Sequence, residues 1–395
     1  MDPIIILGIL LALLFNFANG LNDAANSIAT IIATKALTPL QAVLLAGVFN
    51  LLGPLLFTTA IAATIGRGIV DPGSLTPILI LMGMAGAVLW VLATSFFGIP
   101  VSSSHALIGG LLGAGIAAAG TGAILWPSLV VIEQTVIYGF IGAILGAVIT
   151  GAVAYRRGDF KPWNLLLGGL IGVTVAIPLA IATGFLKISG ILAVVIFIVI
   201  SPTLGFLSAF ALGTVVTWIF RNHPPRRLSR MFKNLQIFSG SLQAIGHGSN
   251  DAQNAMGIIT AMLLAGGLIT EFSVPLWVIL TSSFAISLGT LLGGWRVIDK
   301  MANRITRIRP YQGFAASTAA GSVLSLMTAF GVPVSTTHAA TGAIMGVGTT
   351  RGYSAVKWGV VREILVAWIL TIPAAAVVAG GCYLAARALI GGGFE

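Results

Sequence analysis

Charged residues are scarce in this sequence. Of its 395 residues only 8% are Asp, Glu, Lys or Arg, whereas 57% are hydrophobic. Soluble globular proteins carry roughly a quarter charged residues, so a water-soluble surface cannot be built from this chain. The mean hydropathy of +1.05 agrees with that exclusion. The composition therefore predicts a polytopic membrane protein.

Cysteine is nearly absent, and so are the signs of a cleaved export signal. The single cysteine, Cys382, excludes a disulfide framework and a cysteine-based metal motif. The N-terminus has no basic region, and no small-residue cleavage site follows the first apolar run. We therefore expect that run to be retained as a membrane-spanning helix.

Acidic residues are half as frequent as basic ones: 10 against 20, for a net charge of +10. The basic residues cluster in short segments between apolar runs, at 156–161, 221–233 and 296–309. This distribution follows the positive-inside rule, so we expect these segments to be cytoplasmic loops. It favours contact with anionic lipids of the bilayer and gives no reason to expect nucleic acid as a partner.

Long apolar runs fill most of the chain. A helix crosses the bilayer in about 20 residues, and the runs predict about 12 membrane segments of a multi-pass protein in the plasma or inner membrane. Two runs are short and rich in Gly and Ala and start with proline, so we expect re-entrant or broken helices at 99–119 and 333–350. The other runs are 4–34, 40–66, 76–97, 128–155, 164–185, 190–220, 235–265, 274–294, 310–330 and 358–385.

Three segments of the first half recur, in the same order, in the second half. "GLNDAANSIAT" from Gly20 matches "GSNDAQNAMGIIT" from Gly248, and "FGIPVSSSHALIGG" matches "FGVPVSTTHAATGA". A weaker match pairs "VVIEQTVI" with "GVVREILV". The nearly constant offset predicts two repeats, 1–155 and 234–395, separated by two spans and a basic loop at 156–233.

The loop charges predict that the repeats are inverted in the membrane. The 67–75 loop has one Arg and one Asp and is expected outside, whereas the corresponding 296–309 loop is basic and expected inside. Met1 and Glu395 would then both lie outside. Inverted repeats with discontinuous helices are typical of secondary transporters, whose site lies near the midplane. The expected fold is an all-α polytopic membrane protein with two inverted repeats.

Asp23 and Asp251 lie at the centre of the duplicated Asn-Asp motifs. A carboxylate is costly inside a bilayer unless it faces a cavity or a partner. Neighbouring asparagines such as Asn22 and Asn250 add oxygen atoms, and oxygen clusters suit hard cations. The sequence therefore predicts cation sites, although the aspartates could instead pair with basic residues of another helix or stay protonated.

The second duplicated element holds a hydroxyl triplet between proline and histidine, at Pro100–His105 and Pro333–His338. Proline favours the first turn of a helix, so free backbone donors and hydroxyls would point into the membrane core and form an anion site. The hydroxyls could alternatively bond helix carbonyls or join neighbouring helices. His105 and His338 could titrate, contact the anion, or bond a backbone carbonyl.

The third matching segment aligns Glu133 with Glu363. Both are expected as carboxylates within membrane spans, and no definite role is assigned to them. Arg362 and Lys357 could neutralise Glu363.

Together these motifs resemble the duplicated signatures of the inorganic phosphate transporter (PiT) family. The resemblance covers nearly the whole chain and implies a cation-coupled phosphate symporter with inverted repeats, alternating access and a homodimeric assembly. Some relatives carry sulfate. Many members have an acidic residue where this chain has Asn50, which leaves an additional cation site there without support. The large cytoplasmic loop of animal members is reduced here to 221–233.

The predicted function is import of inorganic phosphate by symport with sodium or, alternatively, protons. Sodium is favoured because the motifs offer many oxygens, whereas a proton needs one carboxyl. The predicted protein is not an enzyme and has no organic cofactor. A sulfate permease of the same family, an intramembrane aspartyl protease and a channel are the alternatives. Predicted sodium ligands are Asp23, Asn22, Asp251 and Asn250; predicted phosphate ligands are Ser103, Ser104, Thr336, Thr337, Asn26, Asn254 and Gln253.

Overall fold

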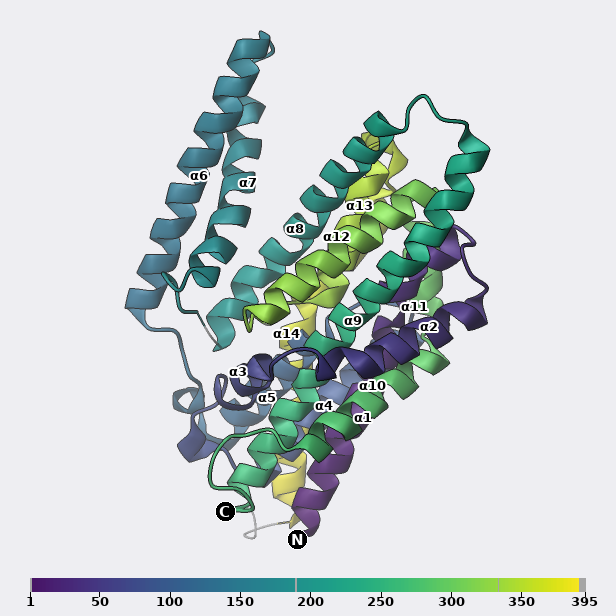
Figure 1. Cartoon of the computed structure of the whole chain (residues 1–395). Helices are drawn as coiled ribbons and strands as arrows, with labels where there is room; N and C mark the ends of the chain where they lie inside the picture. Colours follow the sequence, from purple (N-terminus) through teal and green to yellow (C-terminus); the bar gives the residue numbers. More distant parts are fainter. Residues whose placement is uncertain (1, 189, 333, 391–395) are drawn as a thin grey trace.

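The computed structural model describes residues 2–188, 190–332 and 334–390 (Figure 1). Within these residues the chain forms fourteen α-helices, joined by short 3-10 and π-helical turns, and no β-strand; two isolated bridges are the nearest to one. The prediction of an all-α membrane protein is thereby confirmed.

Among the described residues, six helices are long and apolar enough to cross a membrane, and the number rises to eight if two bent helix pairs each count as one span. The predicted total of about 12 segments is not confirmed by this count and stays a prediction. The six helices are α1 (Pro3–Ala33), α4 (Pro77–Phe96), α6 (Leu129–Arg157), α7 (Pro162–Ala182), α8 (Gly190–Ile219) and α14 (Trp358–Ile390).

Each bent pair breaks where glycine stands beside proline or a second glycine. α2 (Pro39–Leu52) passes through a 3-10 turn at Gly53–Leu55 to α3 (Ala60–Arg67), with a bend of 84°. Pro54 in that turn cannot donate the next helical hydrogen bond. The apolar run predicted at 40–66 is therefore two helices.

The second bend, of 65°, joins α10 (Leu276–Leu292) to α11 (Trp295–Asp299) and the π-helical turn Lys300–Arg304. Gly293 at this bend has φ of 64°, which other residues adopt only at a cost. These helices occupy much of the basic segment predicted as a loop at 296–309.

The elements follow the same order in both halves. α1, the bent α2–α3 pair, α4, α5 (Ser103–Ala119) and α6 correspond in order to α9, the bent α10–α11 pair, α12, α13 and α14. The isolated bridges also occupy matching places, Val70 with Ile124 and Thr306 with Val356. α7 and α8 lie between the two series. The bounds of the remaining helices are α9 (Pro225–Ala265), α12 (Pro310–Ala329) and α13 (Thr336–Thr349).

The basic segment 221–233 is mostly helical, and the expectation of a loop there is wrong. α9 starts at Pro225 and runs for 41 residues. Proline suits the first helical turn, and the following Arg, Leu, Met and Lys residues are good helix formers. The next apolar run begins at residue 235, but the helix that carries it already begins at Pro225.

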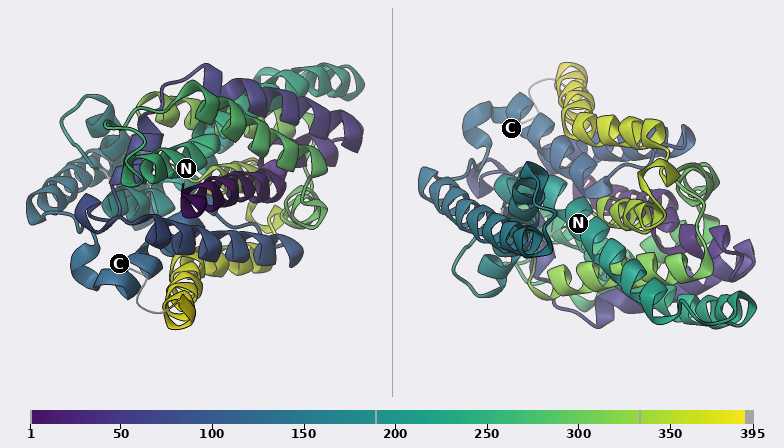
Figure 2. Two further views of the ribbon diagram at one scale, coloured as in Figure 1. Left: turned by 90° about the horizontal axis from the view of Figure 1, so that it is seen from below. Right: turned by 90° about the horizontal axis from the view of Figure 1, so that it is seen from above.

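The α6–α7 hairpin stands apart from the body of the molecule (Figure 1). Its two helices pack closely on each other through glycine: a Cβ at Gly146 would lie 2.0 Å from the carbonyl oxygen of Gly168. Small residues permit such close approach between membrane helices. By contrast, α1 lies among other helices in both end views (Figure 2) and is buried along its second half. α1 and α9 pack together and carry one Asn-Asp motif each.

Candidate functional site

α5 and α13 both begin at the second hydroxyl of their triplets, at Ser103 and Thr336. The sequence had suggested that they begin at the preceding prolines. Ser102 caps α5 by accepting the His105 backbone N–H at 3.3 Å, and Ser335 caps α13 in the same way through His338 at 3.2 Å. Serine is a preferred N-cap, so it fixes the start, and Pro100 precedes the helix. Pro333 lies outside the described residues. The remaining two hydroxyls of each triplet occupy the first helical turn.

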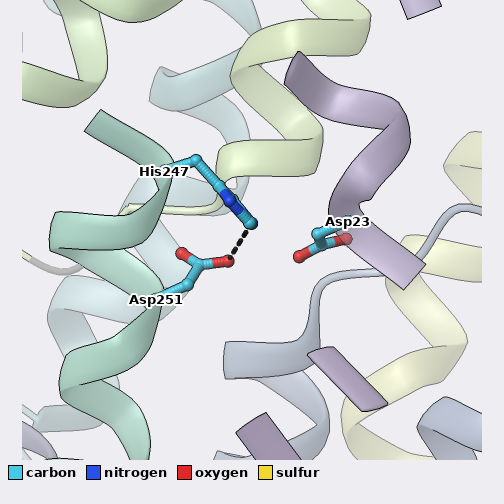
Figure 3. A group of neighbouring side chains, drawn as sticks. All are labelled: Asp23, His247 and Asp251. Atoms are coloured by element: carbon cyan, nitrogen blue, oxygen red, sulfur yellow. Dashed lines mark ion pairs between the residues drawn. The ribbon is translucent and has the colours of Figure 1, made fainter. Parts of the chain in front are cut away.

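The two aspartates meet, although they come from helices in different halves. Asp23 on α1 and Asp251 on α9 lie with His247 so that one ligand atom of each falls within 4.8 Å of the others (Figure 3). All three side chains are buried. Within the described residues neither aspartate pairs with Lys or Arg; His247 Nε2, 3.3 Å from Asp251 Oδ2, is the basic group beside them. Two carboxylates and an imidazole nitrogen form a group that can hold a cation.

The hydroxyls of α5 and α13 donate directly to these carboxylates. Ser103 donates to Asp23 Oδ2 at 3.0 Å, and Thr337 donates to Asp23 Oδ1 at 2.9 Å. Thr336 donates to Asp251 Oδ2 at 3.0 Å. Three of the four predicted phosphate-binding hydroxyls therefore contact the predicted cation-binding carboxylates.

Asparagines of the motifs hold the hydroxyls crosswise between the halves. Asn26 of α1 donates to the Thr336 and Thr337 hydroxyls of α13 at 3.2 and 3.1 Å. Asn254 of α9 donates to the Ser104 hydroxyl of α5 at 2.8 Å. Donors and hydroxyls from both halves thus surround one point, as recognition of an oxyanion requires.

Asn22 and Asn250 reach away from this point, toward the ends of two neighbouring helices. The Asn22 amide donates to Ser95 of α4 at 2.7 Å, and the Asn250 amide lies 3.3 Å from Thr328 Oγ1 of α12. The Oδ1 atom of Asn22 is buried and has no hydrogen-bond partner among the described residues. This oxygen is the atom that Asn22 can offer to a cation.

Gln253 is engaged at both ends with the backbone. Its side-chain oxygen accepts the Ala62 N–H at 3.1 Å, at the start of α3, and its amide donates to the Ser249 carbonyl at 2.8 Å. In this arrangement the Gln253 side chain connects α9 to α3. Its predicted contact with phosphate stays a prediction.

His247 was missed by the sequence reasoning. Its Nδ1 lies 3.1 Å from Asn50 Oδ1, while the Asn50 amide donates to Thr290 at 2.8 Å and Thr290 in turn donates to the Ile286 carbonyl. This chain of donors fixes the Asn50 oxygen toward the ring, so Nδ1 carries the hydrogen and Nε2 faces the aspartates. The signal was available in the spacing of four between His247 and Asp251, which shares one helix face.

Asn19 was missed too, and it occupies in the first motif the place that His247 has in the second. Its side-chain oxygen accepts from the Ser103 hydroxyl at 2.6 Å. The two motifs therefore differ at this position as well, and only the second offers an imidazole.

His105 and His338 form a ring cluster behind the hydroxyls. The His338 ring stacks on Trp368 with centroids 3.7 Å apart, and the His105 ring meets His338 edge-on at 4.9 Å. His338 Nδ1 lies 3.3 Å from the Ile198 carbonyl, which favours the backbone-bonding role among those considered.

The two glutamates do not belong to the site. Both lie in candidate spans, on α6 and α14, as expected, but their side chains are exposed. Glu363 pairs with Lys300 at 3.0 Å rather than with Arg362 or Lys357.

Comparisons of this chain with known proteins all identify phosphate transporters as similar. The sequence profile of the phosphate transporter family matches residues 19–165 and 163–379. A probable low-affinity inorganic phosphate transporter of Rhizobium meliloti (strain 1021) is 42% identical over 97% of both chains. A protein of the same description from Bacillus subtilis (strain 168) is 34% identical over 97% of this chain and 98% of its own length. A solved structure, described as the sodium-dependent phosphate transporter, superposes with a TM-score of 0.70 at 28% identity, covering 98% of this chain and all of that one.

Proposed function

The chain belongs to the phosphate transporter family, a family of transporters rather than enzymes, and on this premise we propose that it imports inorganic phosphate by symport with a cation. The membrane location and the non-enzymatic class are those expected from the sequence, and they exclude the aspartyl protease. The relatives' names give no support to sulfate as substrate. Sodium is favoured as the coupling ion because the solved relative is described as sodium-dependent.

The proposal rests on one observation: the hydroxyls expected to bind phosphate donate to the aspartates expected to bind the cation. Thr336 donates to Asp251 at 3.0 Å, and Thr337 donates to Asp23 at 2.9 Å. The Ser103 hydroxyl lies 3.0 Å from Asp23 but closer to Asn19, at 2.6 Å. A hydroxyl has one hydrogen to donate, so it serves either a carboxylate or a phosphate oxygen. When a cation takes the carboxylate lone pairs, the hydroxyls are free to turn to phosphate.

Charge repulsion also makes phosphate binding depend on the cation. Two unit charges 4 Å apart interact by about 4 kcal/mol at an effective dielectric of 20. Phosphate beside two bare carboxylates would be repelled by more than the starts of α5 and α13 can offset, since a helix dipole contributes at most about 2 kcal/mol. Cation binding at Asp23 and Asp251 removes the repulsion, and phosphate must tighten cation binding by the same factor.

Each predicted site residue has a role in this proposal. The cation is held by Asp23 and Asp251, with the free oxygen of Asn22 and the Nε2 atom of His247. Asn250 joins these ligands when its amide oxygen turns from Thr328 toward the cation. The phosphate ligands are Ser103, Ser104, Thr336, Thr337, Asn26 and Asn254, with Gln253 released from the backbone.

We further propose that the repeats are inverted and that α5 and α13 alternate in opening the site to the two sides. The crosswise contacts of Asn26 and Asn254 support this, because the halves exchange equivalent partners. A cysteine placed at 221–224 should react with an impermeant reagent only from the cytoplasmic side. Labelling from outside intact cells would reject this orientation. The homodimer expected from the family resemblance belongs to the same proposal.

The decisive experiment uses purified protein in liposomes. Radiolabelled phosphate uptake is measured under an inward sodium gradient, an inward proton gradient, or neither. Accumulation above equilibrium with a sodium gradient is the expected result. Equal uptake with and without both gradients would reject symport, and uptake that only equilibrates without saturating would identify a channel.

A further inference from the structure

A cavity of about 470 Å³ lies where α8 ends and both α9 and α12 begin, and none of its lining residues belongs to the aspartate site. Its lining combines aromatic and basic residues. Phe220, Phe232 and Tyr311 form the aromatic part; their rings contact one another edge-on, with centroids 5.3 and 6.4 Å apart. Arg221, His223 and Arg309 supply the basic part.

The positive charge at this cavity is not compensated by the protein. No Asp or Glu lines it, and the ion pairs of the described residues include neither Arg221 nor Arg309. α9 starts here without a side-chain cap, which adds the positive end of its dipole. Burial lowers the pKa of the nearby Arg351 guanidinium, and Arg309 lowers it further. An anion would relieve this concentration of like charge.

The cavity also stands at the membrane boundary. The apolar helix α8 ends at Ile219, and the exposed Trp218 immediately precedes that residue, with the Arg221 guanidinium 5.7 Å from its ring centroid. Tryptophan and arginine in this order mark the level of lipid headgroups. An occupant with an anionic head and an apolar body matches both kinds of lining residue.

We propose that this cavity binds an anionic phospholipid, with its phosphate between Arg221 and Arg309 and its acyl chain against Phe220 and Phe232. Basic pockets between membrane helices hold such headgroups. A free phosphate ion shares the anionic chemistry but leaves the aromatic side uncovered. The lipid would join α8, α9 and α12, and α9 carries Asp251.

The test compares two charge-matched variants of the full chain. In Arg221→Gln/Arg309→Gln the cavity loses both arginines. In the control, Arg226→Gln/Arg227→Gln, the same number of charges is lost from the adjacent turn of α9, which lines a separate hollow. Binding of dioctanoyl phosphatidylglycerol, dioctanoyl phosphatidylcholine and inorganic phosphate is titrated for each purified protein.

Phosphatidylglycerol should bind the cavity variant about 30-fold more weakly than the wild type, with little change in the control. Phosphatidylcholine should bind weakly to all three proteins. Equal losses in both variants, or none, would overturn the proposal. Loss of inorganic phosphate binding in the cavity variant, with phosphatidylglycerol binding unchanged, would overturn it in favour of the free ion.

A measurement on the unmodified protein avoids any folding defect of the variants. A photoreactive phosphatidylglycerol with the reactive group on its acyl chain should label peptides within 216–232. Labelling confined to other helices would overturn the proposal. Neither measurement depends on transport, so its failure is distinguishable from failure of the proposed symport.

Discussion

Replacing Asp23 with Asn should largely uncouple phosphate binding from sodium. The substitution removes one negative charge and keeps the size of the side chain, but its single oxygen can accept from only one of the two hydroxyls, Ser103 or Thr337. Because those hydroxyls lie 2.9 to 3.0 Å from the carboxylate, a phosphate held by them would be close to Asp23. With about 5 Å between the charges, the repulsion is about 3 kcal/mol at an effective dielectric of 20.

The assay is a calorimetric titration of phosphate into the purified protein, with sodium or with choline as the only monovalent cation. A difference of about 3 kcal/mol corresponds to more than a hundredfold in affinity. The sodium dependence of the phosphate affinity should therefore shrink by about that factor in Asp23→Asn, chiefly because phosphate binds better without sodium. Gradient-driven accumulation in liposomes should be lost.

Thr337→Val is the matched control. It removes one hydroxyl that contacts Asp23 and leaves the charge in place. Phosphate binding should weaken, but its dependence on sodium should persist. The reasoning would be refuted if Asp23→Asn kept the wild-type ratio of affinities with and without sodium while remaining folded by thermal unfolding.

Three further outcomes are expected. Ser104→Ala combined with Thr337→Ala should raise the half-saturating phosphate concentration at least tenfold, because each lost hydrogen bond to a charged group is worth about 1.5 to 3 kcal/mol; an unchanged value in uptake assays would count against the anion site. Asn50→Leu should lower sodium affinity by releasing the His247 ring, while phosphate affinity at saturating sodium stays near normal; a sodium titration measures both. Gly146→Val should separate α6 from α7, because its Cβ has no room beside Gly168, and should lower the thermal unfolding temperature by several degrees; an unchanged temperature would show that the hairpin packing is not needed for stability.

The repeat made the centre of the site predictable. Two motifs that match in order and spacing, one in each half, predict equivalent positions around one axis, and Asp23 and Asp251 are found together. The hydroxyls and the asparagines Asn26 and Asn254 could be assigned to the same point on the same ground. The repeat does not determine which atoms are in contact, because hydroxyls that can bind an anion can equally well donate to a carboxylate.

Features that break the repeat were not predictable in the same way. His247 has Asn19 as its counterpart, so no duplicated pattern marks it, and its role depends on Asn50 and Thr290 from other helices. The start of α5 depends on competition between Pro100 and the Ser102 cap, which sequence rules do not rank. The helical character of 221–233 was hidden because its basic residues lie outside any hydrophobic run, although Arg and Lys are good helix formers.

The contact between Asp23 and Thr337 has a consequence for biosynthesis. These residues are 314 positions apart, so α1 enters the membrane long before its partner helix is synthesised. An aspartate at the centre of an inserting helix disfavours insertion by about 2.5 to 3.5 kcal/mol, whereas each Leu or Ile favours it by roughly 0.3 to 0.6 kcal/mol. The dense Leu and Ile residues at the start of α1 supply that compensation. They keep the unpartnered carboxylate within the bilayer until α13 arrives, so weakening this stretch should reduce the yield of inserted protein before it affects transport by the finished molecule.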